Sequence, residues 1–258
     1  MQLFHRILGD KGPFLVILHG LFGSSDNWLT LGKTFAENGF RVVLTDLRNH
    51  GLSEHNETFD LKSIAEDLTE LLSQLTKEKT FILGHSLGGK VAMQLAVTHP
   101  EMINGIIVAD IGPMPYQIRH EDIVSALQSV DTSILQSRKE AEEQLSNTIP
   151  SLEIRQWLLK NLYWKEKNRL DWRFNLNVIA NNLNEVIAGI ESTTPSNVPA
   201  LFLRGELSDY LKESDLDSIK NTFANASMQM IPHAGHWLHA DNPKATLEHC
   251  LSFMELLR

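Results

Sequence analysis

The segment GHSLG at residues 84–88 matches the pattern G-x-S-x-G, in which a serine lies between two small residues. An apolar run ends at Leu83, directly before this segment, and an amphipathic pattern begins near Gly88. A tight strand–turn–helix needs small residues around the central one, because the serine takes a strained backbone conformation. The segment therefore predicts that Ser86 is a nucleophile at the edge of a sheet, rather than part of a plain glycine-rich turn.

A serine hydroxyl is a weak nucleophile near neutral pH and needs a general base to take its proton. The best candidate among the 11 histidines is His236, in the segment AGHW at residues 234–237. It follows an expected strand and precedes the last expected helix. This order places His236 at the carboxyl edge of the sheet, where Ser86 is also expected.

An acid must fix the tautomer of the histidine and stabilise its charged form. Two aspartates lie between Ser86 and His236 in the chain and follow expected strands. Asp110 comes directly after the strand at residues 105–109, whereas Asp209 lies farther out, in an acidic loop. The residues alone favour Asp110 and leave Asp209 as the alternative.

Backbone N–H groups are the expected donors to the oxyanion of an acyl-transfer reaction. One is the N–H of Leu87, next after the nucleophile, and the other belongs to the loop HGLFG at residues 19–23, where we favour Leu21 over Phe22. The side chains that could line a substrate pocket are Phe22, His85, Trp172, Phe174 and Trp237. Aromatic residues at such positions either line an acyl pocket or pack an insert against the core.

The elements that position these residues alternate in kind. Short apolar segments rich in β-branched residues are typical of strands buried on both faces, and they occupy residues 14–18, 41–45, 80–83, 105–109, 200–203 and 227–231. Helical patterns occupy residues 61–75, 90–99 and 243–257. This alternation predicts an α/β fold with a mostly parallel central sheet flanked by helices.

The pattern changes between about Tyr116 and Ser192, where we expect no strand. Helix-like runs occupy residues 121–129, 139–146, 151–162 and 174–190. Because the α/β pattern resumes afterwards, we expect one sheet with a helical insertion that packs over one end of it, rather than two independent domains. The expected organisation is a core at residues 1–114 and 193–258, and a helical cap at residues 115–192.

Two other features are expected to be structural. The polar loop DLRNHGLS at residues 46–53 follows an expected strand, and we expect it to brace the site instead of taking part in the chemistry. Cys250 lies at an apolar position of the last helix and is expected to pack in the core.

Composition excludes several classes of protein. The 258 residues include 23 basic and 32 acidic ones, and this net charge of −9 argues against a nucleic-acid partner. One cysteine allows no intramolecular disulfide and no Cys-rich zinc site, and we expect no metal and no cofactor. The N-terminus shows no secretory signal, and the longest apolar stretch is far shorter than the ~20 residues of a membrane span. We therefore expect a cytoplasmic protein without membrane insertion.

Several stretches together resemble the α/β-hydrolase superfamily over essentially the whole chain, namely residues 18–20, 46–53, 84–89 and 235–236. The order Ser–Asp–His is the order of that fold. More narrowly, five stretches in order resemble the bacterial YbfF-type esterases: residues 19–24, 46–53, 110–113, 172–175 and 235–240.

This resemblance bears on the acid. Most α/β-hydrolases carry G-x-x-D after the penultimate strand, but here Ser208 takes that place and Asp209 lies one position later. YbfF-type enzymes also lack an acid there and use the aspartate after the preceding strand. The resemblance therefore implies Asp110.

The expected function is a serine carboxylesterase that cleaves small to medium acyl esters or thioesters through a Ser–His–Asp triad and an acyl-enzyme. One alternative is a lyase or a C–C bond hydrolase with the same triad. Another is a ligand-binding protein on this scaffold, since a fold does not fix a function. A serine at the centre of the motif disfavours the dehalogenase and epoxide-hydrolase chemistries of this fold, which use a carboxylate nucleophile.

Overall fold

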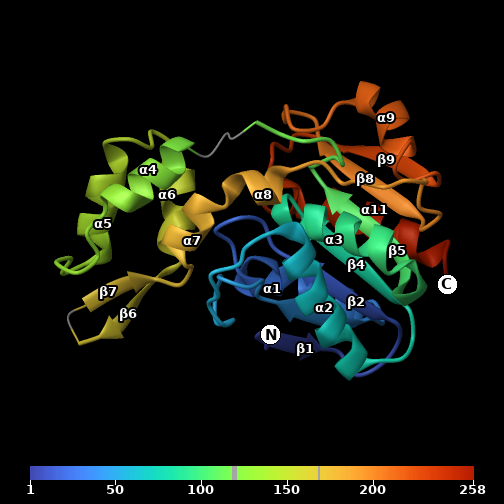
Figure 1. The fold of residues 1–258 in the computed structure, drawn as a ribbon, viewed down its shortest axis with the longest axis horizontal. Coiled ribbons are helices and arrows are strands. Elements are labelled where there is room, and N and C mark those ends of the chain that lie inside the picture. The colour runs from blue at the N-terminus through green and yellow to red at the C-terminus, as the bar shows by residue number, and fades with distance from the viewer. Residues whose placement is uncertain (118–120, 168) are drawn as a thin grey trace.

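A computed structural model describes residues 1–117, 121–167 and 169–258 of the chain (Figure 1). In these residues, seven strands form one sheet in the order β1-β3-β2-β4-β5-β8-β9. The strands are β1 (His5–Leu8), β2 (Phe14–Leu18), β3 (Arg41–Thr45), β4 (Thr80–His85), β5 (Ile103–Ala109), β8 (Ala200–Gly205) and β9 (Ala226–Ile231). Strand β1 pairs antiparallel with β3, and the other neighbours in the sheet are parallel. The expected α/β class is confirmed.

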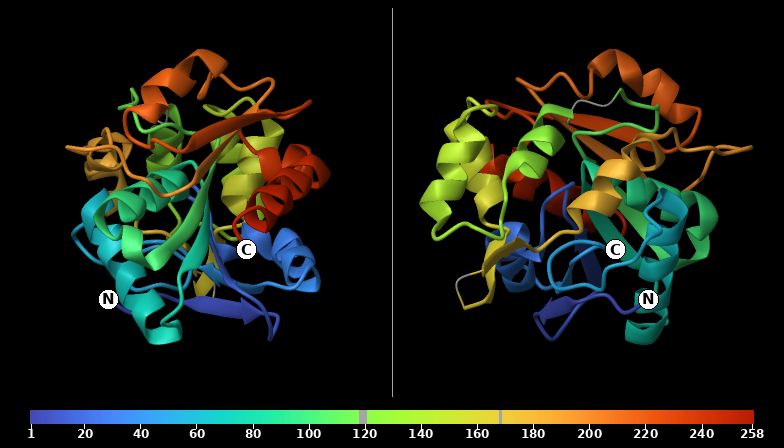
Figure 2. Two further views of the ribbon diagram at one scale, coloured as in Figure 1. Left: turned by 90° about the vertical axis from the view of Figure 1, so that its right-hand side faces the viewer. Right: turned by 60° about the vertical axis from the view of Figure 1, so that its left-hand side comes forward.

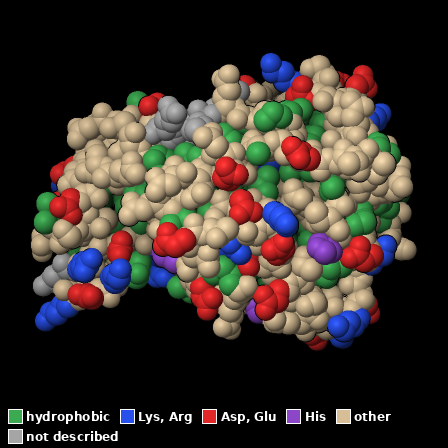
Figure 3. Space-filling model, viewed as in Figure 1, with side chains coloured by type: hydrophobic (Ala, Val, Ile, Leu, Met, Phe, Trp, Pro, Cys, Tyr) green, Lys and Arg blue, Asp and Glu red, His purple; other side chains and the backbone are tan. Residues whose placement is uncertain are grey.

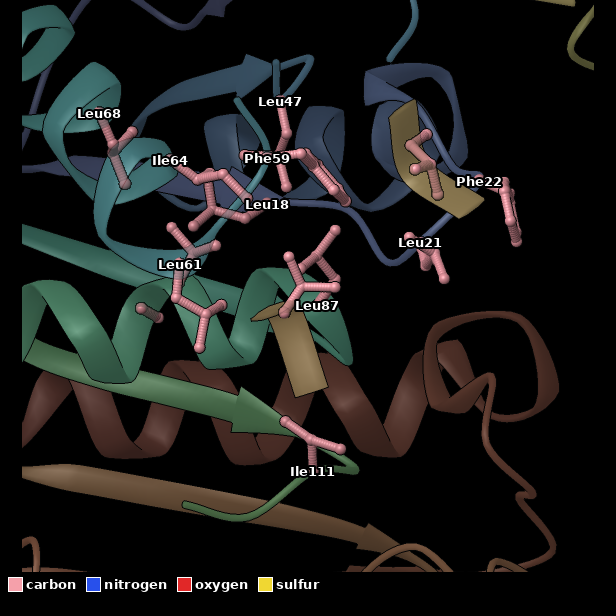
Figure 4. Packing of buried hydrophobic residues seen from close by; sticks show 14 of the residues in the cluster. Leu18, Leu21, Phe22, Leu47, Phe59, Leu61, Ile64, Leu68, Leu87 and Ile111 are labelled. Carbon is pink, nitrogen blue, oxygen red and sulfur yellow. The ribbon is translucent and has the colours of Figure 1, made fainter. Parts of the chain in front are cut away.

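Helices cover both faces of the sheet (Figure 2). On one face lie α2 (Leu61–Leu75) and α3 (Leu87–Thr98), and on the other lie α1 (Leu29–Glu37) and α11 (Pro243–Glu255). Strand β2 is buried at every position because alternate side chains enter the two cores. Figure 4 shows Leu18 of β2 among residues of α2 and α3. Cys250 is fully buried in the other core, as expected.

The chain leaves the sheet after β5 and returns to it at β8, and we call the intervening residues 115–192 the insert. Its described elements are α4 (Glu121–Ser129), α5 (Arg138–Ser146), α6 (Leu152–Leu159), β6 (Leu162–Glu166), β7 (Arg169–Trp172), α7 (Leu176–Asn181) and α8 (Leu183–Ile187). In Figure 1 most of the insert lies to one side of the sheet. The expected helix over residues 174–190 is two short helices that meet at Asn182.

The expectation of no strand in the insert was wrong, because β6 and β7 form an antiparallel hairpin. Strand β6 has the sequence LYWKE and only its first residue is buried. A largely exposed strand leaves no continuous apolar run, which is the signal that identified the strands of the sheet. Strand β1 was not predicted for the same reason, because none of its four residues is fully buried.

Short elements complete the described fold: η1 (Ser25–Trp28), η2 (Pro100–Met102), η3 (Glu213–Asp215), α9 (Leu216–Lys220) and α10 (Leu238–Asp241). Acidic and basic side chains are interspersed over the face shown in Figure 3. Within the described ranges, none of the helices has the length and apolar character that crossing a bilayer requires.

Candidate active site

Ser86 lies in a sharp turn between β4 and α3, with the positive φ of 50° and a ψ of −114°. The turn brings backbone atoms so close together that only glycine fits at the positions two before and two after Ser86. A Cβ atom on Gly84 would lie 2.1 Å from the carbonyl oxygen of Gly88, and one on Gly88 would lie 2.4 Å from that of Leu18. The sequence motif thus has a steric cause, and it leaves the Ser86 side chain at the carboxyl edge of the sheet.

His236 and Asp110 are joined by a hydrogen bond of 2.8 Å between Nδ1 and Oδ2. Asp110 directly follows β5, has a positive φ of 55° and is fully buried. Its other oxygen accepts a hydrogen bond of 3.0 Å from the N–H of Gly205, and the hydroxyl of Ser208 donates to Oδ2. The carboxylate that contacts His236 is therefore that of Asp110, and Ser208 supports this carboxylate from the loop in which Asp209 also lies.

The imidazole of His236 lies between two other rings. Tyr210 stacks on it at 4.0 Å between ring centroids, and His85 lies 4.7 Å away. The Nε2 atom of His85 lies 2.8 Å from the carbonyl oxygen of His236 and donates to it. Burial holds the pKa of His85 well below its usual value, so this ring is neutral and places no second positive charge beside His236.

The loop after β2 lies beside the serine turn. Within it, the N–H of Phe22 already donates to Nε2 of His50 at 3.2 Å. The residue before it, Leu21, lines the same cavity as Ser86. The N–H of Phe22 is thus engaged with His50, whereas Leu21 lies at the cavity that Ser86 lines.

Residues 46–53 brace this loop through buried hydrogen bonds. The carboxylate of Asp46 accepts from the N–H groups of Ser25 and Leu52 at 2.6 and 2.8 Å. Burial lowers the pKa of His50 to about 3, so its ring stays neutral and can accept from the N–H of Phe22. These contacts agree with the bracing role expected for the loop.

Arg48 anchors the bracing loop to α2. Its guanidinium contacts both carboxylate oxygens of Asp67, at 2.6 and 2.8 Å, and both side chains are buried. Two more of its hydrogen bonds go to the carbonyl oxygens of Thr58 and Ser63. Because the pair is bidentate and Arg48 also donates to two carbonyl oxygens, these hydrogen bonds offset the free-energy cost of burying the two charges.

A cavity of about 290 Å³ opens between the sheet edge and the insert. Ser86, His236 and Trp237 line it from the core, whereas Ile123, Ile154 and Trp157 line it from the insert. Trp157 and Trp237 lie 5.7 Å apart and bring the two parts of the chain together. Residues of the core and of the insert therefore surround Ser86.

The candidate pocket residues divide into two groups. His85 and Trp237 line the cavity with Ser86. Phe22, Trp172 and Phe174 are not among its described lining residues, and they pack on one another instead, with ring centroids 5.0 and 5.4 Å apart. All three are nearly or fully buried, so they join the insert to the loop at residues 19–23. Packing of the insert against the core was the alternative expected for Trp172 and Phe174.

Sequence reasoning missed several residues that line the cavity. Ile154 and Trp157 are three positions apart in a helical run, so they lie on one face of α6. That spacing could have identified them once the run was expected to cover the sheet edge. Tyr210 carried no such signal, because it lies in a loop without a periodic pattern.

Comparison with known proteins identifies the family of the chain. The family described as the alpha/beta hydrolase fold matches residues 13–132. Over 254 residues the chain is 37% identical to the sn-1-specific diacylglycerol lipase ABHD11 of Danio rerio, a match that covers 96% of this chain and 80% of the relative. The chain belongs to the α/β-hydrolase family.

Other similar proteins of the family are named esterases. This α/β hydrolase is 33% identical to Esterase YbfF of Escherichia coli, over 90% of the chain and 89% of the relative. A solved structure described as a marine microorganism esterase is 42% identical and superimposes with a TM-score of 0.95, over 98% of this chain and 99% of the other. The resemblance to YbfF-type esterases and the α/β-hydrolase fold expected from the sequence are both confirmed.

Proposed function

We propose that this α/β hydrolase is a serine carboxylesterase that cleaves small to medium acyl esters or thioesters. Ser86 is the nucleophile, His236 the general base and acid, and Asp110 the acid that orients His236. The observation that carries the proposal is the His236–Asp110 hydrogen bond of 2.8 Å, next to a serine that lines the same cavity as His236. The esterase and lipase names of similar proteins support it.

The reaction follows from the positions of these groups. The Ser86 oxygen attacks the carbonyl carbon of the substrate while its proton passes to Nε2 of His236. The N–H groups of Leu21 and Leu87 stabilise the negative charge that forms on the carbonyl oxygen. The bond to the leaving oxygen or sulfur then breaks, and His236 returns the proton to the leaving group. Water then attacks the acyl-enzyme while His236 takes one of its protons. The bond between the acyl carbon and the Ser86 oxygen breaks, His236 returns the proton to that oxygen, and the carboxylic acid is released.

Asp110 contributes through its burial and its hydrogen bonds. Because its carboxylate accepts from Nδ1–H of His236, the Nε2 atom is left without a proton and can act as a base. The bonds from Gly205 and Ser208 hold this carboxylate in place. The neutral state of His85 leaves the positive charge that develops during the reaction on His236 alone.

The cap role of residues 115–192 and a cytoplasmic location belong to the same proposal. The cap role is supported by Ile123, Ile154 and Trp157 of the insert, which line the cavity that Ser86 also lines. A cap of this kind excludes water and shapes the space that the substrate occupies.

The test is turnover of p-nitrophenyl esters from acetate to palmitate by the wild type and by Ser86→Ala. A matched control is Ser73→Ala, which removes an exposed serine of α2. We expect activity with a chain-length optimum in the wild type and the control, and its loss in Ser86→Ala. Equal hydrolysis by Ser86→Ala would refute the proposal. Absence of turnover in all three proteins, for oxygen esters and thioesters alike, would favour a lyase, a C–C hydrolase or a binding protein.

A further inference from the structure

Ser86 lies where two cavities of unequal size meet. The larger is the cavity of about 290 Å³ described above, and the smaller has about 30 Å³. Three residues, Leu21, Ser86 and Tyr210, line both of them. A substrate carbonyl bound at Ser86 would thus have one space on each side.

The two cavities differ in their access to the base. His236 lines the larger cavity but is not among the described residues that line the smaller one. The smaller cavity lies over α3 and under α8, with walls that include Leu87, Ile111 and Val186. Only a group in the larger cavity is therefore beside the atom that donates and accepts the proton.

The positions of the base and of the acyl group are linked by the chemistry. His236 must protonate the leaving oxygen or sulfur, so the leaving group has to lie on the side of His236. The water that cleaves the acyl-enzyme gives its proton to the same nitrogen and needs the same space. The acyl chain stays attached to Ser86 throughout and must occupy the other side.

The volumes set a limit on each group. A cavity needs roughly 10–15 Å³ of such volume before it holds a single water-sized group. The space of 30 Å³ therefore admits only a few heavy atoms beyond the carbonyl carbon, whereas the space of 290 Å³ is about tenfold larger. The difference is large enough to separate short acyl groups from long ones.

The walls of the smaller cavity are held in place. Val186 and Ile111 are almost completely buried. Lys90 also lines the cavity, and its ammonium donates to the carbonyl oxygens of Met114 at 2.6 Å and Ala188 at 2.9 Å. These bonds tie α3 to the residue before the insert and to the insert itself, so moving the walls apart would break them.

The larger cavity has an aromatic lining. Trp28, Trp157, Tyr210 and Trp237 contribute to it, together with apolar side chains. Such walls favour flat or branched apolar groups, which bury large areas against aromatic rings.

We propose, on the basis of the proposed function, that the smaller cavity binds the acyl group and the larger cavity binds the leaving group. The substrates are then esters or thioesters of short acids, with acyl groups of up to about four carbons, and of bulky apolar or aromatic alcohols or thiols. The size of Val186 sets the acyl limit.

The experiment measures kcat/KM along two series of esters. One series varies the acid, from p-nitrophenyl acetate through butyrate to octanoate. The other keeps the acetyl group and varies the alcohol, from ethyl through benzyl to naphthylmethyl, so that the acidity of the leaving group stays similar. We expect at least a tenfold fall between butyrate and octanoate, and a rise from ethyl to naphthylmethyl, since one methylene in an apolar pocket changes selectivity by about tenfold or more.

Three variants show which cavity determines the acyl preference and which determines the alcohol preference. Val186→Ala enlarges the smaller cavity and should raise the hexanoate-to-butyrate ratio by about tenfold. Val186→Leu reduces that cavity and should lower the butyrate-to-acetate ratio, so the proposal does not depend on one variant folding. Ile154→Ala is the matched control in the larger cavity, and it should change the alcohol series while leaving the acyl ratios unaltered.

Failure of this inference is distinct from failure of the proposed function. Two results would overturn the assignment of the cavities while Ser86-dependent ester hydrolysis remained. One is an optimum at octanoate or longer, and the other is a set of acyl ratios that change in Ile154→Ala but not in the Val186 variants. Absence of Ser86-dependent hydrolysis of every ester and thioester would instead overturn the proposed function.

Discussion

The Nδ1 atom of His236 lies 2.8 Å from Oδ2 of Asp110, although 126 positions separate the two residues in the chain. Asp110 directly follows β5, and His236 lies in the loop after β9. Between these strands in the sheet lies β8, whose following loop carries Ser208. The hydroxyl of Ser208 donates to the same carboxylate, so the acid comes from one strand and its support from the next.

Replacing Asp110 by Asn should remove most of the activity without unfolding the protein. The amide leaves the geometry almost unchanged but favours the wrong tautomer of His236, and we expect kcat to fall by about 10⁴-fold. Asp209→Asn is the matched control and should retain activity close to that of the wild type. Esterase assays with circular dichroism on both variants decide the matter, and the reverse pattern would assign the acid to Asp209.

Ser208→Ala should weaken catalysis far less than Asp110→Asn. The change removes one hydrogen bond to the carboxylate of Asp110, and such a bond is worth about 1.5–3 kcal/mol, so we expect kcat to fall by about 10- to 100-fold with little change in KM. Ser208→Thr keeps the hydroxyl and should restore most of the activity. If Ser208→Ala and the wild type had equal kcat, the hydroxyl would have no part in positioning Asp110.

Breaking the buried pair between Arg48 and Asp67 should destabilise the fold. Arg48→Met leaves the carboxylate of Asp67 buried without its bidentate partner, and we expect the free energy of unfolding to fall by about 3 kcal/mol. The control is Lys139→Met, which removes one partner of an exposed pair on α5 and should leave the urea midpoint almost unchanged. Similar midpoints for both variants would show that residues 46–53 do not depend on this pair.

Lys90 should make stability depend on pH. Burial lowers its pKa from 10.5 to about 7 in the folded protein. Between these two values the unfolded chain binds more protons at Lys90 than the folded chain, so the free energy of unfolding rises with pH. Relative to Lys90→Met, the wild type should gain up to about 1.4 kcal/mol per pH unit between pH 7 and pH 10. Urea denaturation at pH 7, 8 and 9 measures this gain, and Lys139→Met should keep the slope of the wild type. Parallel pH dependences in the wild type and Lys90→Met would contradict the expectation.

The sequence was most informative where one local rule decides the structure. The turn at Ser86 requires glycine at positions 84 and 88 for steric reasons, and the fully buried strands require continuous apolar runs. His236 and Asp110 could be placed at one sheet edge because both follow parallel strands. That their side chains meet depends on the register of β5, β8 and β9, which no local pattern encodes.

The insert was predicted less completely. Its exposed hairpin lacks a continuous apolar run, and the helices that cover the cavity take their orientation from contacts such as Trp157 with Trp237. Trp172 and Phe174 show the same difficulty. Their aromatic character suits either a pocket or a packed interface, and only the fold shows that Phe174 packs against Phe22.

The proposed reaction depends on an acyl-enzyme formed at Ser86. The most direct measurement is mass spectrometry of peptides after rapid acid quenching of the wild type with p-nitrophenyl acetate, with Ser86→Ala as the control. We predict one acetyl group on the peptide that contains Ser86, formed and lost at rates that account for turnover, and none on that peptide in the variant. Steady hydrolysis by the wild type with no acetyl group on Ser86 at any quench time would contradict the acyl-enzyme mechanism.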